Sequence, residues 1–427
     1  MKIQTISFFA QIIKQIPRLE FNNIVQKHQA DRFSKRFTAW DQLIAMLWCQ
    51  FSGAESLREI EIGLQSGVGR LQHINARPMA RSTLAYANEK RTYKVFEDLY
   101  YYLKKQLFNS PLQGIGAEFD KTVLSLDSTT ISLCLSQFPW AHYRRAKGGV
   151  KVHTLLNNDS LLPEFMVMTN AKVHDVKAAK DKVLQRVPPH CILVMDRGYC
   201  DFGLFKALDA KGVVFVTRLK TNWQFKRTGQ GVIDRNYGDF KIQFTSVTAV
   251  NKIGKDNEFR AVKWYSKEDE RWFVFLTNAS DDITAEQVAK LYKDRWQIEL
   301  FFKRMKQNLK ILSFVGTTEN AVLVQIWTAA ITVLLQMYLQ KCSKHSWNFS
   351  NLVKCIRLNL MTLKDLTEWF SRPDLCSYSD VNGFRTVATI YFGKIDLCLS
   401  WVALSEGPRP FGLLRLKGFY KRKTAPK

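Results

Sequence analysis

The spacing of apolar and polar positions changes along the chain, and its first part is helical. Residues from Trp40 to Phe51 carry apolar side chains at helical spacing, and Ser56 to Leu64 makes a short second element. Ser82 is placed to cap a third, long helix that runs toward Leu107. The pattern predicts a helical N-terminal domain over residues 1–115, with short helices joined by turns.

From residue 121 the period becomes that of strands. Short apolar runs bounded by turn residues are typical of buried strands. The predicted order is strand 122–127, strand 150–156, strand 163–169, helix 175–187, strand 191–196, helix 202–211 and strand 213–218. Strands interleaved with helices predict an α/β fold with a mixed sheet, whose functional residues sit at strand ends.

Residues from about 220 to 278 alternate in short segments, which predicts a β-rich insertion. A long helix from Thr284 to about Ile311 follows it. The C-terminal region, 321–427, is predicted to be largely helical around residues 352–370. It closes with a basic tail from Lys417 to Lys427.

One segment, Val322 to Leu339, is nearly long enough and apolar enough to cross a membrane. Polar residues interrupt it, among them Gln325 and Thr328, and the sequence has no second such run. We therefore expect a helix buried in the protein core and no membrane partner.

The charge balance points to a polyanionic partner. The chain carries 63 Lys and Arg against 38 Asp and Glu, a formal net charge of +25. Nucleic acids are the commonest large polyanions that use such a field, although ribosome-associated, membrane-surface and merely basic proteins share it. An apolar fraction of 46% indicates a folded chain. Eight cysteines without a Cys-x-x-Cys pair, and an N-terminus without a secretory signal pattern, favour a reduced protein in the cytoplasm.

Two aspartates stand where catalytic carboxylates are expected. Asp127 is predicted to end the first strand, in Leu124-Ser125-Leu126-Asp127, and Asp196 to end the fourth, before Arg197-Gly198-Tyr199. A carboxylate at the end of a buried strand is rigidly placed and still faces solvent. An aspartate after a strand also commonly begins a turn, so neither residue is decisive alone.

The third carboxylate lies on the long helix. At about 100° per residue, Tyr292, Arg295, Glu299 and Lys306 fall within roughly 60° of one another. A separate apolar stripe is formed by Leu291, Ile298, Phe302, Met305 and Leu309. An ordinary amphipathic helix with an Arg295–Glu299 pair would look similar. Phosphodiester cleavage by two metal ions, however, needs converging carboxylates, and their hard oxygen donors suit Mg²⁺ or Mn²⁺.

These residues resemble a known family, the DDE transposases of bacterial insertion sequences marked by Tyr-x2-Arg-x3-Glu-x6-Lys. Tyr292, Arg295, Glu299 and Lys306 match that signature. The segments that begin at Asp127 and Asp196 are similar to the family's two aspartate motifs. The segment Phe215 to Arg218 resembles the aromatic-x-x-Arg segment that follows the second motif.

The resemblance implies an RNase H-like catalytic core over residues 116–320, interrupted by the β-rich insertion, and an accessory N-terminal domain. Asp127, Asp196 and Glu299 would be catalytic and would hold two Mg²⁺ or Mn²⁺ ions. Tyr292, Arg295, Lys303 and Lys306 would grip the phosphates of the transposon ends. A homodimer on paired ends of double-stranded DNA, the terminal inverted repeats and the target, is also implied.

Other residues are candidate DNA contacts, although each has an ordinary structural explanation. Trp296 is placed to stack on a base or to pack in the core. The basic residues around Gly148-Gly149 either line the DNA channel or belong to a solvated hairpin turn, and they are Arg144, Arg145, Lys147 and Lys151. Arg218 is a further candidate, and a group in the helical domain consists of Arg77, Arg81, Lys90 and Arg91.

The predicted function is a DNA transposase that nicks transposon ends and performs strand transfer. Two other classes remain open at this point. One is a DNA-binding protein derived from a transposase that has lost catalysis. The other is a different RNase H-like nuclease, such as a junction resolvase or an RNA–DNA hybrid nuclease.

Overall fold

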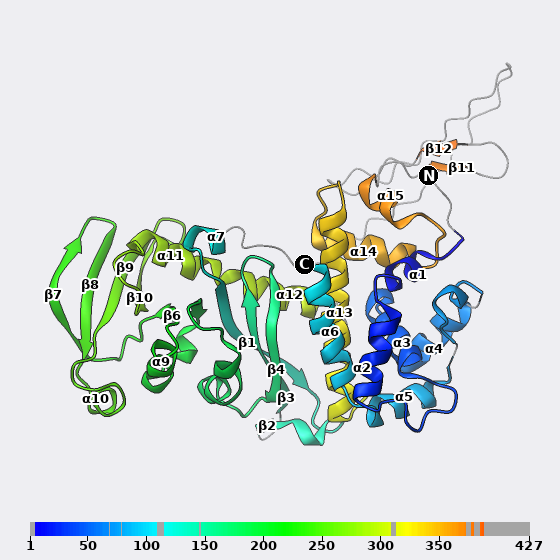
Figure 1. The fold of residues 1–427 in the computed structure, drawn as a ribbon, viewed down its shortest axis with the longest axis horizontal. Helices are drawn as coiled ribbons and strands as arrows, with labels where there is room; N and C mark the ends of the chain where they lie inside the picture. Colours follow the sequence, from blue (N-terminus) through cyan, green and yellow to red (C-terminus); the bar gives the residue numbers. More distant parts are fainter. Residues whose placement is uncertain are drawn as a thin grey trace, which may run out of the picture.

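The computed structural model describes most of the chain. The described residues are 5–67, 69–77, 79–108, 115–144, 147–308, 313–372, 377–379 and 385–387. Arg145, Leu309 and the basic tail from Lys417 to Lys427 lie outside them. Figure 1 shows an elongated molecule, with the β-rich segment 220–278 at one end, the N-terminal helices at the other, and the remaining strands of the sheet between them.

The N-terminal part is helical, as predicted. The segment from Trp40 to Phe51 lies in α3 (Ala39–Ser52), which begins with a capping box in which Thr38 and Asp41 bond each other's backbone N–H. The other helices are α1 (Phe8–Ile13), α2 (Arg18–Lys27), α4 (Leu57–Ser66), η1 (Gln72–Ile74), α5 (Arg81–Lys90), α6 (Lys94–Leu107) and α7 (Ile115–Phe119).

The long helix predicted from Ser82 to Leu107 is wrong in two respects. It divides into α5 and α6, because Arg91, which follows α5, has an extended backbone. Ser82 lies inside α5 and does not cap it, since the N-cap position belongs to Ala80. Arg81 therefore begins α5 while Lys90 ends it, so these two cations stand at opposite ends of one helix.

A ten-stranded mixed sheet forms the rest of the core, in the order β2-β3-β1-β5-β6-β10-β9-β8-β7, with β4 also paired to β3. Strands β1, β5 and β6 run parallel, and β3 and β4 are antiparallel to their neighbours. Their bounds are β1 (Val123–Leu133), β2 (His142–Arg144), β3 (Lys147–Asn157), β4 (Leu162–Asn170), β5 (Ile192–Met195) and β6 (Val214–Arg218). The α/β prediction with a mixed sheet is confirmed.

Short helical elements lie between the strands. The predicted helix 175–187 consists of three short consecutive helical segments. Helix α9 (Phe202–Asp209) corresponds to the predicted helix 202–211. The remaining elements are η2 (Pro139–Ala141), α8 (Asp175–Ala178), η3 (Ala179–Val183), η4 (Leu184–Arg186) and η5 (Arg197–Tyr199).

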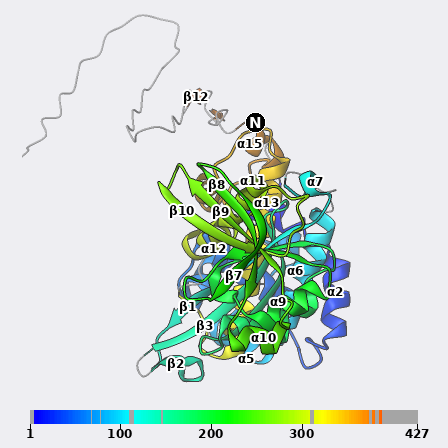
Figure 2. The ribbon, with the colours of Figure 1, turned by 90° about the vertical axis from the view of Figure 1, so that its left-hand side faces the viewer.

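The strands expected as an insertion continue the same sheet. Strand β10 (Arg271–Thr277) pairs with β6, and β9 (Phe259–Ser266), β8 (Tyr237–Phe244) and β7 (Phe225–Ile233) follow outward, all antiparallel. Helix α10 (Val247–Ile253) lies between β8 and β9 in the chain. Figure 2 shows these strands fanned by the twist of the sheet in front of the helical part.

The long helix predicted over 284–311 is broken. Helix α11 (Ala285–Asp294) and helix α12 (Trp296–Asn308) are separated at Arg295, whose N–H bonds to the carbonyl of Tyr292 as in a 3₁₀ turn. The predicted apolar stripe is buried where it is described, at Leu291, Ile298, Phe302 and Met305. This stripe anchors both helices and leaves the Glu299 face at the margin of the contact.

Helix α13 (Glu319–Cys342) contains the apolar segment that resembles a membrane span. Of its most apolar window, 89% is buried inside the molecule, against α3, α5 and α6. A core helix was expected and is found. The C-terminal region continues with α14 (Phe349–Asn359) and α15 (Leu366–Ser371), and β11 (Ser377–Ser379) pairs with β12 (Arg385–Val387).

Asp201 couples α9 to its surroundings and offers a test of the fold. Its carboxylate accepts from the Leu204 N–H as the N-cap and pairs with Lys180 and Lys252. Burial by itself would raise the pKa of Asp201, but these three partners lower it to about 2.

We expect Asp201→Ala to reduce the free energy of unfolding by about 1–2 kcal/mol, because a cap and two ion pairs are lost. Asp201→Asn keeps the cap and should cost less. Since the folded pKa lies below the unfolded value of about 3.9, the carboxylate stabilises the fold above about pH 4. That contribution disappears as the pH falls toward 2. Urea unfolding at several pH values measures both effects, and equal losses in the two variants would contradict the capping role.

Candidate active site

The sheet register places the two predicted aspartates side by side. Leu126 of β1 is paired with Met195 of β5 in a parallel ladder. Asp127 directly follows Leu126, and Asp196 directly follows Met195. Neighbouring strands are about 4.8 Å apart, and paired positions face the same side of a sheet. Asp196 follows the end of β5, as predicted. Asp127 does not end its strand, because β1 continues for six more residues along β3 to Leu133.

Glu299 is joined to this pair through Arg295. The Nη1 atom of Arg295 donates to Asp127 Oδ2 at 3.0 Å, and its Nη2 atom donates to Glu299 Oε1. The guanidinium is 14% exposed, so it lies between the two carboxylates and largely out of water. The break at Arg295 thus brings α12, with Glu299 in its first turn, against the middle of β1.

The electrostatics of Asp127 show that the three acids share one environment. The pKa of Asp127 is raised to about 6, chiefly by burial and in smaller part by the negative charges of Asp196 and Glu299. The Ser128 N–H, at 2.7 Å, and Arg295 act in the opposite direction by stabilising the carboxylate. A half-buried group of acids that repel one another favours a cation among them.

In this structure Asp127 and Glu299 are bound to Arg295, and the described acids are not set as a metal site. Among the described residues, no three His, Cys, Asp or Glu side chains are already arranged as a metal site, and Arg295 supplies the positive charge between Asp127 and Glu299. The side of Gly198 that faces the site is open, since a Cβ there would meet only Asp196 Oδ2, at 3.6 Å. The oxygen donors fit a hard divalent cation, provided that Arg295 gives up its carboxylates.

Two more predicted residues come to the same place. Tyr292 packs on Phe275 with ring centroids 5.0 Å apart, and the Cζ atom of Arg295 lies 5.5 Å from the centroid of the Tyr292 ring. Burial raises the pKa of Tyr292, and Arg218, at the end of β6, is close enough to lower it. Trp296 is 56% exposed, so it does not pack in the core, and its stacking on a base stays a prediction.

The predicted lysines divide into two groups. Lys303 is exposed on α12, and Lys306 donates from Nζ to the Thr130 carbonyl of β1 at 3.2 Å. Lys151, in contrast, is 13% exposed and is held by Asp175 and by the Val173 carbonyl, both at 3.2 Å. Its environment therefore favours a structural role.

The remaining predicted cations lie at the turn between β2 and β3. Arg144 and Lys147 are paired residues at the ends of β2 and β3, and Arg145 between them lies outside the described residues. Their role as DNA contacts stays a prediction.

Asp175 is the first residue of the predicted helix 175–187, and it also contacts the site. His174 holds the N-cap position of α8, and the Asp175 carboxylate accepts from the Ser128 hydroxyl at 2.6 Å. Ser128 is the neighbour of Asp127 and bonds it through its N–H. Asp175 thus contacts Asp127 indirectly, through Ser128. No local signal reveals this role, because its partner is 47 residues away.

Comparison with known proteins identifies the family of the chain. Residues 118–335 match the family described as the transposase DDE domain, and residues 4–77 match a domain of unknown function. A putative transposase of Sinorhizobium fredii is 30% identical over 274 residues, covering 62% of this chain and 74% of the relative. A putative insertion-sequence transposase of Synechocystis is 29% identical and covers 60% of this chain and 70% of its own length.

A probable insertion-sequence transposase of Geobacillus stearothermophilus is 28% identical, covering 54% of this chain and 60% of the relative. The solved piggyBac transposase synaptic complex with hairpin DNA covers 88% of this chain and 81% of its own, at 12% identity and a TM-score of 0.41. That structural likeness is too low to support an argument.

The chain belongs to the DDE transposases of bacterial insertion sequences. It is therefore a DNA-cleaving and strand-transferring enzyme with an RNase H-like core, and members of its family use divalent metal ions. The predicted family and enzyme class are confirmed.

Proposed function

We propose that the chain nicks DNA at the terminal inverted repeats of a mobile element and then joins the freed 3′-hydroxyl to a second phosphodiester. Asp127, Asp196 and Glu299 are the proposed catalytic residues and hold two Mg²⁺ or Mn²⁺ ions. When bound, the ions activate the attacking oxygen and stabilise the leaving one. The observation that carries the proposal is the position of Asp127 and Asp196, each directly after the last paired residue of the β1–β5 ladder, with one guanidinium connecting Asp127 to Glu299.

The chain's own residues hold and orient the DNA. The proposed phosphate contacts are Arg218 at the end of β6, Tyr292 on α11 and Lys303 on α12. Lys306 and Trp296 lie on the same helix as Glu299. Arg295 contacts a phosphate once it has released Asp127, because a bidentate guanidinium suits a phosphate as well as a carboxylate.

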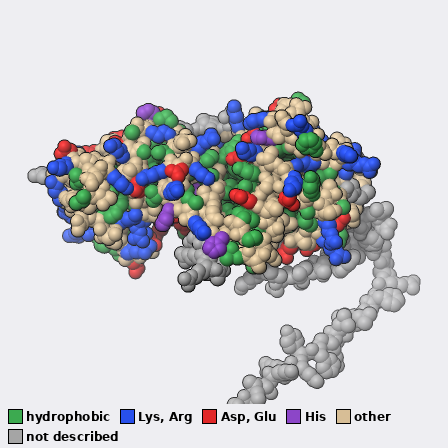
Figure 3. All heavy atoms as spheres, turned by 90° about the horizontal axis from the view of Figure 1, so that it is seen from below, with side chains coloured by type: hydrophobic (Ala, Val, Ile, Leu, Met, Phe, Trp, Pro, Cys, Tyr) green, Lys and Arg blue, Asp and Glu red, His purple; other side chains and the backbone are tan. Residues whose placement is uncertain are grey.

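The basic surface gives the DNA a broad area to bind. Figure 3 shows Lys and Arg side chains spread over the lower face of the molecule from the β-rich end to the helical end. We propose that two copies assemble on paired ends, since two ends must be joined, and that the enzyme works in the cytoplasm on double-stranded DNA.

The deciding experiment measures nicking and strand transfer together. The purified protein is incubated with supercoiled plasmid that carries the element's ends, with Mg²⁺, with Mn²⁺ or with EDTA. We expect metal-dependent nicks at the ends and joined products. Binding without nicking would favour a protein that has lost catalysis. Nicking without joined products would favour another RNase H-like nuclease.

A further inference from the structure

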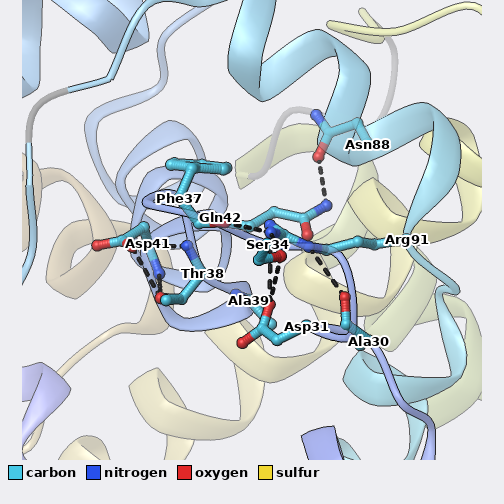
Figure 4. Close-up of polar contacts among 10 residues, drawn as sticks. All are labelled: Ala30, Asp31, Ser34, Phe37, Thr38, Ala39, Asp41, Gln42, Asn88 and Arg91. Atoms are coloured by element: carbon cyan, nitrogen blue, oxygen red, sulfur yellow. Dashed lines mark hydrogen bonds and ion pairs between the residues drawn. The ribbon is translucent and has the colours of Figure 1, made fainter.

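Arg91 is a buried clamp on the loop between α2 and α3. It is 12% exposed, its Nε donates to the Ala30 carbonyl at 3.2 Å, and its Nη2 donates to the Ser34 hydroxyl and the Phe37 carbonyl. It also pairs with Asp31 at 3.3 Å. Figure 4 shows these contacts converging on the guanidinium. Arg91 was a candidate DNA contact in the sequence, but this burial excludes it from touching a phosphate directly.

The loop is fixed from its other side as well. Asp31 Oδ1 accepts from the Ala39 N–H at 2.8 Å and from the Ser34 hydroxyl at 3.2 Å. The capping box of Thr38 and Asp41 fixes the point where the loop enters α3. Residues 31–37, called the Phe33 loop below, are therefore held in one shape by polar contacts beneath them.

The outward side of the Phe33 loop is cationic and aromatic. Phe33 is 90% exposed, and the Arg32 guanidinium lies 5.3 Å from its ring centroid. Lys35 and Arg36 are exposed beside it. Asp31 is the one acidic residue of the loop, and its charge is engaged by Arg91. A fixed loop that leaves an aromatic ring in water and surrounds it with three cations is suited to a partner that is anionic and also has apolar surface.

We propose that the Phe33 loop binds duplex DNA, with Arg32, Lys35 and Arg36 on phosphates and Phe33 against sugars and base edges in the minor groove. Duplex DNA meets both requirements of the loop, negative charge and exposed apolar edges. The loop lies in the 4–77 segment, whose matching family has no function assigned. The inference rests on the proposed function in that it takes the enzyme's own DNA as the ligand.

The test measures affinity for a labelled mixed-sequence duplex as a function of salt, with the full chain. Replacing Arg32, Lys35 and Arg36 together by Ala should make the negative slope of log K against log salt shallower. Its magnitude should fall by up to about 2.7, at about 0.9 per phosphate contact. Phe33→Ala should weaken binding about tenfold and leave the slope unchanged. The matched control keeps the three charges of the loop by exchanging the cations, as Arg32→Lys, Lys35→Arg and Arg36→Lys, and it should leave the salt dependence unchanged.

If the loop triple and the control triple change the slope equally, and Phe33→Ala binds as the wild type does, the inference is overturned. The altered side chains are exposed, so the variants should melt as the wild type does, and a melting curve checks this. A wild type that binds the duplex but never nicks would count against the proposed catalysis and leave the loop's role intact. If the wild-type enzyme nicks DNA and every loop variant binds as the wild type does, only the proposed role of the Phe33 loop is rejected.

Discussion

Asp196→Asn is expected to reduce nicking by at least about a thousandfold while the protein remains folded. The carboxylate lies half-buried beside Asp127 and accepts one hydrogen bond, from the Gly198 N–H at 3.2 Å. Asparagine can still accept that bond, so the local turn should survive. What is lost is a negative charge close to Asp127, at one of the three proposed metal ligands. Plasmid nicking with Mg²⁺ measures the rate, and a melting curve monitors the fold.

Asp201→Asn is the matched control for this prediction. It makes the same chemical change five residues further along the chain, at a carboxylate that caps α9 and pairs with two lysines. It should lower stability slightly and leave nicking within a few fold of the wild type. Similar nicking by wild type and Asp196→Asn would remove Asp196 from the site. A comparable loss in both variants would trace the effect to the fold.

A second measurement separates catalysis from metal binding. Titration calorimetry with Mn²⁺ should show weaker binding for Asp196→Asn than for the wild type, because one oxygen charge is missing. Unchanged Mn²⁺ binding together with lost nicking would assign Asp196 a role in the reaction that does not involve the metal.

The parts of the fold that could be predicted are those with a local signal. Asp196 follows a four-residue apolar strand bounded by turn residues, and α3 carries helical spacing and a cap. For Asp127 the predicted strand end is wrong. Its strand continues because β3 pairs with it as far as Leu133, and that partner is distant in sequence.

Other features depend on tertiary contacts that a local pattern does not contain. The helix break at Arg295 follows a segment with good helical spacing, and the ion pair with Asp127 that accompanies it spans 168 residues. Lys151 reads as a solvated cation in a basic turn, yet Asp175 holds it inside the fold. The β-rich strands alternate as an insertion would, and only the pairing of β10 with β6 makes them part of one sheet.

Arg295→Gln is expected to strengthen Mn²⁺ binding in the absence of DNA. In the wild type the guanidinium already satisfies Asp127 and Glu299, so a metal ion must displace it. Without it, Asp127, whose pKa the charges of Asp196 and Glu299 already raise, has no cation beside it. Glutamine keeps hydrogen-bonding capacity and removes the charge.

The same change should destabilise the metal-free protein by about 3–5 kcal/mol, the usual cost of leaving a buried ionic partner unpaired. Added Mn²⁺ should restore much of that loss, because binding to the folded state alone stabilises it by mass action. Thermal melts with and without Mn²⁺ should therefore show a larger metal-induced shift for Arg295→Gln than for the wild type.

Lys303→Gln removes the same charge from the same helix at an exposed position, and it should melt and bind Mn²⁺ as the wild type does. A metal-induced shift in Arg295→Gln no larger than that of Lys303→Gln would show that Arg295 does not compete with the metal. If the shift is larger, Arg295 occupies Asp127 and Glu299 in the enzyme without DNA and so opposes metal binding there. Phosphates that draw Arg295 away would then open the acids to metal, so that DNA binding and metal binding favour each other.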